Sequence, residues 1–363
     1  MQVSFVDLKA QYNSIKPEID AAIHGILDNT SFIGGPIVKE FEENFSRYCG
    51  TNHCVNCANG TDAIEIALQA LGIGTGDEVI VPAMSWIATS EAVTTVGATP
   101  VFADILPTKW TIDPEEVKKK ITAKTKAIIP VHFYGKPAEM AEIMEIAQEN
   151  GLKVIEDSAQ AHGAAHAGQP IGTFGNIATF SFYPGKNLGA YGDAGAIVTN
   201  DEKLAEKCRK IGNHGQLQKH DHLLEGRNSR MDTIQAAVLN VKLKYLEEWT
   251  ERRINHAKYY NEELSGLDFT LPEINHDRHV FHVYVVNFEN RDQVKTELLN
   301  RGISTQLHYP NALPMLKPYA SINNPDDYPV AGRLANCGLS LPLYPEIPRE
   351  QIDYVVKCLS EIL

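Results

Sequence analysis

Between residues 50 and 200 the chain alternates short apolar segments with segments whose apolar residues recur at helical spacing. The apolar segments are rich in β-branched residues and are bounded by Gly, Pro, Asp or Asn; they cover 77–83, 99–105, 125–133, 152–159, 177–184 and 195–200. Continuous apolar strands separated by helices are typical of βαβ units, in which helices cover both faces of a parallel sheet. The pattern therefore predicts a doubly wound α/β domain with a mostly parallel central sheet.

The pattern changes after residue 230. Residues 231–267 contain no strong helix breaker before Gly266, which predicts one long helix that could join two domains. The segments 279–288 and 291–303 are typical of a strand and a following helix.

The C-terminal part is less regular. Residues 307–333 are rich in turn-forming residues and predict loops, whereas 349–362 predict a final helix. We therefore expect a large domain over 1–245 and a smaller α+β domain over 246–363, with the N-terminal helix packing near the small domain.

The composition is that of an ordinary globular protein, with 43% hydrophobic and 22% charged residues among 363. The formal net charge of -13 argues against nucleic acid or an anionic membrane as the main partner and favours a small ligand. The N-terminus lacks a basic stretch followed by an apolar segment, and no run of 18 apolar residues occurs. These features predict a cytoplasmic protein.

Six cysteines are too few for a disulfide scaffold in a chain of this length and suit a reducing compartment. Cys54 and Cys57 form a C-x-x-C pair, but no second pair or histidine stands at zinc spacing. We interpret this pair as packing residues of a short strand that leads into a turn, and we expect no metal site.

One acidic residue, Asp157, ends an apolar strand within the segment 154–164. Ligands of open α/β sheets bind at the carboxyl ends of strands, so this carboxylate is expected to face a crevice. There it could keep a pyridinium nitrogen protonated, which is what makes pyridoxal phosphate (PLP) an electron sink. A turn or helix cap is the alternative interpretation.

A glycine-rich loop follows the strand at 177–184 and contains Lys186 between Gly185 and Gly189. A long amine in such a loop can reach into a cleft. A lysine amine forms an imine with an aldehyde and can carry a proton between carbon atoms of substrate and cofactor. An isolated lysine is otherwise a solvated surface charge, but the spacing from Asp157 favours the chemical role.

Residues 59–68 predict a turn followed by an amphipathic helix that begins near Asp62. Amides at a helix N-terminus bind phosphate, and Gly60 and Thr61 would offer N–H groups and a hydroxyl. Ser181 would add a second hydroxyl. Ordinary helix capping is the alternative, and the Lys-Ser/Thr of a nucleotide-binding P-loop is missing.

Five segments together resemble the DegT/DnrJ/EryC1/StrS family of PLP-dependent sugar aminotransferases: NGTDA, PAMSWIATSEAV, EDSAQAHGA, SFYPGKNLGAYGDAGAI and GRNSRMDTIQAAVL. They occur in the order and spacing of that family, and the resemblance extends from residue 32 to residue 352. It implies the fold-type I aminotransferase architecture, with a mostly parallel large domain and a smaller α+β C-terminal domain.

The resemblance implies that Lys186 forms the imine with PLP and that Asp157 pairs with the pyridine nitrogen. It also implies that Trp86 stacks on the ring, that Gln160 lies near the 3-hydroxyl, and that the phosphate is held by Gly60, Thr61 and Ser181. Asn228 would reach the phosphate from a neighbouring subunit, so the active unit would be a homodimer with shared active sites.

For the substrate, the resemblance implies a pocket that includes Tyr183, His308 and Tyr309, whereas Arg230 is either a substrate contact or part of an intramolecular ion pair. Ala194 stands where the family usually has glycine, which concerns local backbone geometry and not chemistry. The branch of the family that deoxygenates sugars has histidine in place of the lysine, so Lys186 favours transamination.

We therefore expect an aminotransferase that moves an amino group from L-glutamate to a keto group, at C3 in preference to C4, of a nucleotide-linked deoxyhexose. Such a reaction would serve the biosynthesis of a cell-surface polysaccharide or a secondary-metabolite sugar. The alternatives are an aminotransferase for a cyclitol or other non-nucleotide keto acceptor, and a non-catalytic PLP-binding regulatory protein. The sequence leaves UDP, dTDP and GDP open as the nucleotide.

Overall fold

The computed structural model describes residues 1–267, 269–274 and 277–363. The strands of its main sheet are β1 (His53–Cys57), β2 (Glu78–Pro82), β3 (Thr99–Ala103), β4 (Thr125–Ile128), β5 (Lys153–Asp157), β8 (Ile177–Ser181) and β9 (Gly195–Thr199). They lie in the order β1-β9-β8-β5-β4-β2-β3, and only β9 is antiparallel to its neighbours. The α/β prediction is confirmed, and each apolar segment contains one strand.

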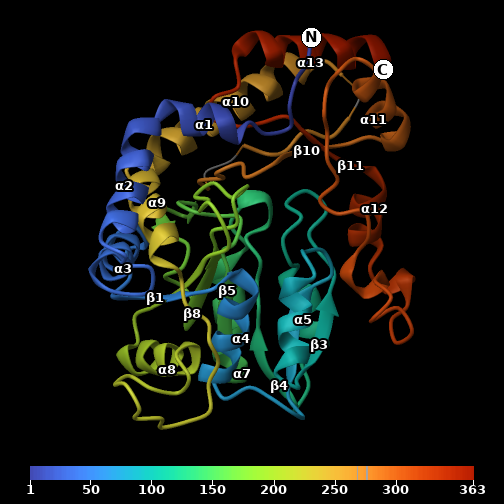
Figure 1. The fold of residues 1–363 in the computed structure, drawn as a ribbon. Helices are drawn as coiled ribbons and strands as arrows, with labels where there is room; N and C mark the ends of the chain where they lie inside the picture. Colours follow the sequence, from blue (N-terminus) through green and yellow to red (C-terminus); the bar gives the residue numbers. More distant parts are fainter. Residues whose placement is uncertain (268, 275–276) are drawn as a thin grey trace.

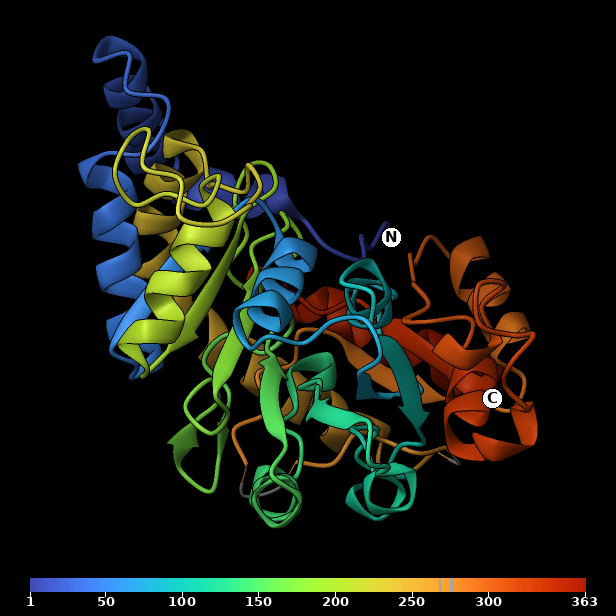
Figure 2. The same cartoon turned by 90° about the horizontal axis from the view of Figure 1, so that it is seen from below.

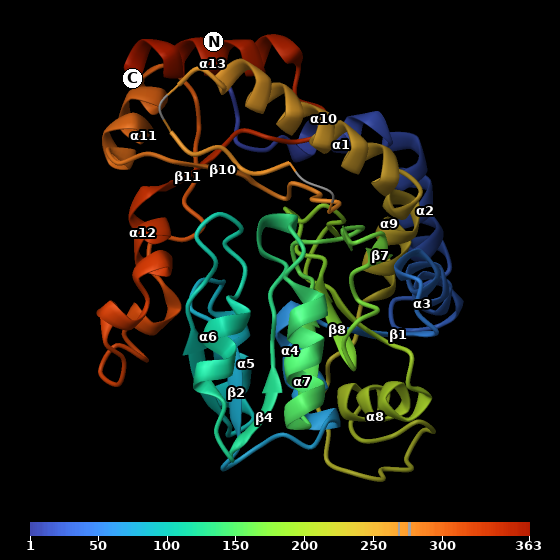
Figure 3. The same cartoon turned by 180° about the vertical axis from the view of Figure 1, so that it is seen from behind.

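Helices cover both faces of this sheet (Figures 1 and 3). One face packs against α4 (Gly60–Ala70), α5 (Ala88–Thr95) and α8 (Glu202–Gly212). The other face packs against α3 (Pro36–Cys49), α6 (Pro114–Lys120), α7 (Met140–Asn150) and α9 (Thr233–Leu243). As the sequence predicts, α7 ends before Gly151, which adopts a left-handed conformation that suits glycine.

Alternation along β5 decides which side chains reach the site. Val154 belongs to the apolar cluster under α6 and α7, whereas Ile155 belongs to the cluster under α4 and α5. Successive side chains of a strand point to opposite faces. Glu156 therefore points to the same face as Val154, and Asp157 points to the same face as Ile155. The same period directs Ser181, the last residue of β8, to the face of α4.

A second core lies in the C-terminal part of the chain. Helices α10 (Leu246–Leu264), α11 (Arg291–Asn300) and α13 (Arg349–Ile362) pack on a two-stranded sheet of β10 (Tyr284–Asn287) and β11 (Gly338–Leu341). Figure 1 shows these elements above the carboxyl ends of the main sheet. The final helix is confirmed, and the domain boundary at residue 245 stays a prediction.

The N-terminal segment contacts both cores. Val3 pairs with Ile303 and is buried in the second core. Helices α1 (Leu8–Ser14) and α2 (Lys16–Asp28) follow, and Ile19 packs against Val238 of α9 and Trp249 of α10. Figure 2, which views the molecule from below, shows α2 and α3 on the side opposite the C-terminal segments.

The prediction of one long helix over 231–267 is wrong, because α9 and α10 are separate helices. The N–H groups of Lys244 and Tyr245 bond to carbonyls three residues earlier, which tightens the turn between them. The bend lets α9 pack on the main sheet while α10 packs on the second core. No glycine or proline marks it, so the sequence carried no local signal.

A further helix, α12 (Pro329–Cys337), begins in the segment expected to be loops. Its start is capped by Asp104, whose carboxylate accepts hydrogen bonds from the N–H groups of Val330 and Ala331, each at 2.9 Å. Because Asp104 lies in a distant part of the sequence, local capping signals could not reveal this helix.

The remaining regular elements are short: the hairpin of β6 (Ala165–His166) and β7 (Gln169–Pro170), and the 3₁₀ turns Phe133–Gly135, Leu313–Met315 and Pro325–Asp327. Within the described residues, none of the helices has the length and apolar character that crossing a lipid bilayer requires.

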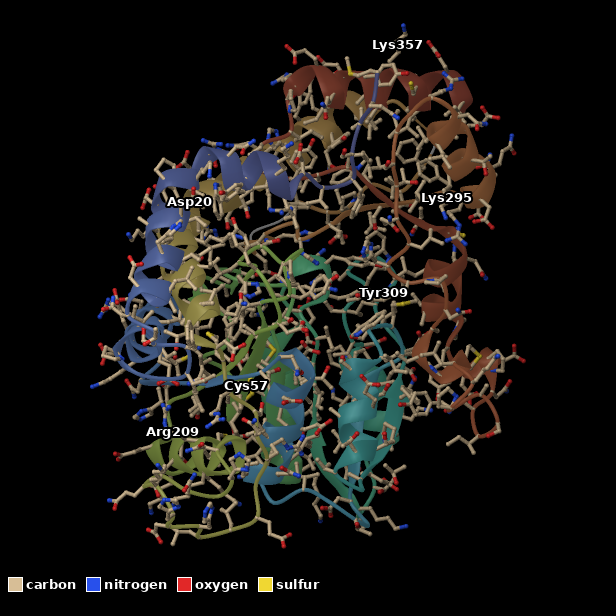
Figure 4. The ribbon with its side chains drawn as sticks, viewed as in Figure 1. Asp20, Cys57, Arg209, Lys295, Tyr309 and Lys357 are labelled. Atoms are coloured by element: carbon tan, nitrogen blue, oxygen red, sulfur yellow. The ribbon has the colours of Figure 1, made fainter. Side chains whose placement is uncertain are left out.

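The cysteine pair consists of packing residues, as its sequence context predicts. Cys54 and Cys57 are three residues apart on β1, so they point to opposite faces of the sheet, and each is buried in a different apolar cluster. Burial raises the pKa of both thiols, and both are free. Figure 4 labels Cys57 within the layer of α4 and the sheet.

Glu156 anchors the segment that leads from β5 to β8. Its buried carboxylate accepts hydrogen bonds from the N–H groups of Gly172, Phe174 and Gly175 at 2.7–2.9 Å. His132 contacts the same carboxylate through Nε2 at 3.1 Å and accepts the N–H of Ala138 at Nδ1, so the neutral ring donates to Glu156.

Replacing Glu156 by Gln should lower the free energy of unfolding by about 2–4 kcal/mol, because a neutral amide loses charged acceptors and turns donors toward buried N–H groups. Urea unfolding of the purified protein measures the change. The control is Glu43→Gln, at a side chain that is 59% exposed, for which we expect a change within about 0.5 kcal/mol. Equal stability of both variants would contradict the role of Glu156.

Candidate active site

A cleft of about 750 Å³ opens at the carboxyl ends of β5 and β8. Its opposite wall includes Arg253, His282 and Leu343 of the C-terminal part. Ten residues assigned by sequence line it: Gly60, Thr61, Trp86, Asp157, Gln160, Ser181, Tyr183, Lys186, His308 and Tyr309. In Figure 4, Tyr309 lies between the main sheet and the C-terminal segments above it.

Asp157 is 5% exposed and stands at the end of β5. Its carboxylate accepts hydrogen bonds from the hydroxyl of Thr89 at 2.9 Å and the N–H of Ala159 at 3.2 Å. Burial raises the pKa of this carboxyl, and the two hydrogen bonds and the charge of Lys186 oppose the rise. The carboxylate is thus held in one orientation at the wall of the cleft.

Thr89 is itself held by Ser85, because the two hydroxyl oxygens lie 2.8 Å apart. Since Thr89 donates to Asp157, its oxygen accepts from Ser85. Thr89 and Ser85 are not among the site residues predicted from the sequence. Both lie in the segment PAMSWIATSEAV, where Ser85 precedes α5 and Thr89 lies in its first turn, so no regular spacing distinguishes them in the sequence.

Lys186 lies in the loop after β8, and its backbone N–H donates to the carbonyl of Tyr183 at 2.8 Å. Burial lowers the pKa of the amine to about 8, and the charge of Asp157 opposes this shift. Such an amine is partly neutral near neutral pH and can therefore act as a nucleophile and a proton carrier. Lys186 and Asp157 both line the cleft, and the charge of each opposes the shift that burial causes in the pKa of the other.

A second lysine supports this loop. Lys242 of α9 is 1% exposed and donates a hydrogen bond from Nζ to the carbonyl of Gly189 at 2.7 Å. Burial lowers the pKa of its amine to about 8. Sequence reasoning missed Lys242, because a lysine among apolar residues of a helix is usually a surface charge.

The phosphate-binding residues predicted by sequence lie together at the start of α4. The side chain of Asn59 caps this helix by accepting the N–H of Asp62 at 2.8 Å. A Cβ on Gly60 would lie only 2.6 Å from the Cβ of Ser181, so glycine is required by the close approach. Among the described residues the N–H groups of Gly60 and Thr61 have no hydrogen-bond partner, which leaves them for an anion.

Gln160 connects the two walls of the cleft. Its Oε1 accepts the N–H of Tyr134 at 2.7 Å, and its Nε2 donates to the hydroxyl of Tyr309 at 3.2 Å. The ring of Tyr309 lies 5.3 Å from that of Trp86, which is 57% exposed. Gln160 is therefore fixed, with one amide hydrogen left for a ligand.

Two neutral histidines complete the C-terminal wall. Burial lowers the pKa of His308 to about 4, and its Nδ1 lies 2.8 Å from the hydroxyl of Ser340. Burial also holds the pKa of His282 well below its usual range. Nδ1 of His282 lies 3.1 Å from the amide oxygen of Asn187, the neighbour of Lys186.

Asn228 and Arg230 do not line the cleft of this chain. Both side chains are exposed, and the segment that carries them pairs with Asn213 through Asn228. Neither residue forms an ion pair or side-chain hydrogen bond within the described ranges, so the intramolecular ion pair considered for Arg230 is not formed there. Arg227, next to Asn228, pairs with Glu65 instead.

Comparison with known proteins places this geometry in a family. The profile of the DegT/DnrJ/EryC1/StrS aminotransferase family matches residues 13–360. The chain belongs to this family.

Two relatives match this chain over nearly their whole length. A protein named "Pleiotropic regulatory protein" of Geobacillus stearothermophilus is 45% identical, over 99% of this chain and 98% of that protein. The dTDP-3-amino-3,4,6-trideoxy-alpha-D-glucose transaminase of Streptomyces venezuelae is 44% identical, over 99% and 96%.

A solved structure of S. venezuelae DesV, in complex with a ketimine intermediate, has a TM-score of 0.97 and 44% identity, over 99% of this chain and 98% of that chain. The present chain, as a member of this family, is therefore a transaminase. It has the fold expected from its sequence. Similar solved structures are described with bound PMP or in a PLP form, and pyridoxal phosphate is the cofactor.

The residues present fit that cofactor. The unpartnered N–H groups of Gly60 and Thr61 suit its phosphate, and the amine of Lys186 suits its aldehyde. The oriented carboxylate of Asp157 suits its ring nitrogen. The cleft volume is that of a site for a cofactor and a small substrate.

The depressed pKa of Lys186 predicts how apoenzyme combines with PLP. Only the neutral amine attacks an aldehyde, so the rate should rise with pH through about 8 and level off above it. The visible absorbance of the lysine-linked cofactor measures the rate. The control is N-acetyl-lysine, whose rate should keep rising toward its ordinary pKa of about 10.4. A midpoint above about 10 in the protein would contradict the shift.

Proposed function

We propose that this transaminase moves an amino group from L-glutamate to the C3 keto group of a nucleotide-linked deoxyhexose. The observation that carries the proposal is the convergence of Lys186 and Asp157 on one cleft whose opposite wall presents His308 and Tyr309. The product would serve the biosynthesis of a surface polysaccharide or a secondary-metabolite sugar.

The names of relatives support position C3 for this chain. Relatives that are 40–44% identical include a UDP-N-acetyl-3-dehydro-alpha-D-glucosamine 3-aminotransferase, a UDP-2-acetamido-2-deoxy-3-oxo-D-glucuronate aminotransferase and a dTDP-3-amino-3,6-dideoxy-alpha-D-galactopyranose transaminase. All three names place the nitrogen or the oxo group at C3. They divide between UDP and dTDP, so the proposal leaves the nucleotide open.

Each residue contributes to the proposed reaction in a definite way. Bound PLP withdraws electrons from the substrate carbon that loses or gains a proton. Lys186 binds the cofactor and, once released, carries the proton at that carbon, for which its pKa of about 8 is suited. Asp157, oriented by Thr89 and Ala159, holds the proton of the ring nitrogen.

A regulatory protein that binds PLP without turnover is the second candidate. Two relatives carry names of this kind, "Pleiotropic regulatory protein" and "Erythromycin biosynthesis sensory transduction protein EryC1". Regulation and turnover are compatible in one chain. The buried, hydrogen-bonded Asp157 favours turnover, because cofactor binding alone needs no partner for the ring nitrogen.

The half-reactions test the proposal. Holoenzyme mixed with L-glutamate should lose the visible absorbance of the lysine-linked cofactor and release stoichiometric 2-oxoglutarate. A 3-keto nucleotide sugar should then restore the absorbance faster than a 4-keto counterpart or a keto-cyclitol.

Lys186→Ala should abolish both the absorbance and turnover, whereas Lys244→Ala, at a side chain that is 67% exposed, should preserve them. An absorbance that L-glutamate leaves unchanged would favour the regulatory candidate. Restoration by the 4-keto sugar or the cyclitol alone would overturn the acceptor.

We further propose that the active unit is a homodimer in which Asn228 serves the partner's cofactor. Asn228 is exposed in the single chain and does not line its cleft. Ile33, which is 59% exposed, pairs with Asp232 beside this segment, and its neighbour Phe32 is 46% exposed. Exposed apolar side chains next to an unused polar residue favour burial by a second copy.

Complementation tests the shared site. Lys186→Ala and Asn228→Asp should each be inactive alone, because one lacks the amine and the other repels the phosphate. Unfolding and refolding them together should restore about a quarter of wild-type activity, since half the dimers would be mixed and each would hold one intact site. Mixtures as inactive as the separate variants would indicate that Asn228 acts within its own chain.

A further inference from the structure

Tyr134 lies behind the cleft, at the junction between the main sheet and the C-terminal part of the chain. It follows β4, is 3% exposed and does not belong to the described lining of the cleft. Its backbone has a φ of 59°, in the left-handed region that residues other than glycine rarely occupy. Such a conformation costs free energy, so it persists only where surrounding contacts fix it, and residues of this kind gather at functional sites.

Each polar group of Tyr134 contacts a different residue. Its N–H donates to Oε1 of Gln160 at 2.7 Å, and its hydroxyl donates to the carbonyl of His308. Its carbonyl accepts the N–H of His282 at 2.9 Å and lies 3.2 Å from Nε2 of His279. Because Gln160, His282 and His308 all line the cleft, Tyr134 connects three separate parts of the lining from behind.

The side chain of Tyr134 is held by two aromatic rings. Phe133 stacks on it with the ring centres 3.9 Å apart, and Trp110 packs against it edge-on at 5.8 Å. Burial raises the pKa of Tyr134 well above its usual value, and the neighbouring Tyr309 adds to the rise. The hydroxyl therefore keeps its proton near neutral pH and remains a donor to the carbonyl of His308.

The contacts of Tyr134 converge on Tyr309. The carbonyl of His308, which accepts from the hydroxyl of Tyr134, is bonded directly to the nitrogen of Tyr309. Gln160, whose Oε1 accepts the N–H of Tyr134, donates from Nε2 to the hydroxyl of Tyr309 at 3.2 Å. Tyr134 thus fixes both the backbone and the hydroxyl of Tyr309. The ring of His308 has an anchor of its own, because its Nδ1 lies 2.8 Å from the hydroxyl of Ser340.

We propose that Tyr134 is a positioning residue for the acceptor and holds Tyr309 where the sugar ring binds. The inference rests on the proposed function, because it takes Tyr309 to meet a keto-sugar. Hydrogen bonds to a sugar have fixed directions, and a misplacement of about 1 Å in an active site is costly. The hydroxyl of Tyr134 therefore contributes to acceptor binding without touching the acceptor.

The alternative is a hydroxyl that only satisfies a buried carbonyl and stabilises the fold. Tyr328 provides a matched control, because it is 4% exposed and its hydroxyl donates to Oδ1 of Asn323 at 2.9 Å, just before α12. Phe at either position removes one buried hydrogen bond and keeps the ring. Only Tyr134→Phe should change acceptor binding, whereas both variants should lower the temperature of thermal unfolding.

Binding can be measured apart from turnover in Lys186→Ala loaded with pyridoxamine phosphate, because this protein lacks the proton carrier. Calorimetric titration with a 3-keto nucleotide sugar gives the Kd. Adding Tyr134→Phe should raise the Kd about 10-fold, which corresponds to the loss of one buried hydrogen bond. Adding Tyr328→Phe instead should change it by less than about 2-fold.

A double-mutant cycle separates positioning from a general effect on the fold. Tyr309→Phe removes the hydroxyl that Tyr134 positions, so the variant with both changes should bind the sugar within about 3-fold of Tyr309→Phe alone. L-glutamate has no sugar ring. In protein with Lys186 intact, Tyr134→Phe should therefore react with L-glutamate within about 3-fold of wild type.

The outcomes are distinct. An unchanged Kd in Tyr134→Phe, or independent losses for Tyr134→Phe and Tyr309→Phe, would overturn the proposal. Equal losses with the sugar and with L-glutamate would also overturn it, because they indicate a structural role. If the protein binds a keto-cyclitol but none of the nucleotide sugars, the proposed function fails, and the same cycle with the cyclitol still tests Tyr134.

Discussion

The chemistry of the cleft depends on one electrostatic relation, between the carboxylate of Asp157 and the amine of Lys186. Burial raises the pKa of Asp157 and lowers the pKa of Lys186, which favours the neutral form of each group. The charge of each group partly opposes the shift in the pKa of the other. The relation follows from the fold, because parallel β5 and β8 end at the same edge of the sheet. Asp157 ends one strand, and Lys186 lies in the loop after the other.

The surrounding polar groups fix the positions of the Asp157 carboxylate and of the loop that carries Lys186. Ser85 and Thr89 fix the carboxylate through a chain of hydroxyls, and Lys242 holds the loop of Lys186 from behind. Ser85 and Thr89 line the cleft beside Asp157, whereas Lys242 supports the loop from outside the cleft lining. Arg253, on the opposite wall, is the one arginine among the described residues that line the cleft.

Much of the fold could be predicted from the sequence, since the period of apolar residues is local information. Every apolar segment from 77 to 200 contains its strand, and Asp157, Lys186, Gly60 and Ser181 could be assigned because motif spacing places them at strand and helix ends. The bend at Lys244 and the start of α12 could not be predicted, because they depend on packing and on the distant carboxylate of Asp104.

Residues that support the site through hydrogen bonds or that line the opposite wall could not be predicted from the sequence either. Thr89, Lys242 and Arg253 resemble ordinary helical residues until the fold brings each against a particular carboxylate, carbonyl or cleft wall. Asn228 differs, because a single chain gives no partner for it. The role proposed for Asn228 rests on the family resemblance and on its exposure, and it would belong to the assembly rather than to the subunit.

A crystal structure of the holoenzyme would show which side chains hold the two ends of the cofactor. We expect continuous electron density from Nζ of Lys186 into the cofactor, with a carboxylate oxygen of Asp157 within hydrogen-bond distance of the pyridine nitrogen. Cofactor density that is linked to a different side chain, or a ring nitrogen that faces a residue other than Asp157, would contradict this expectation.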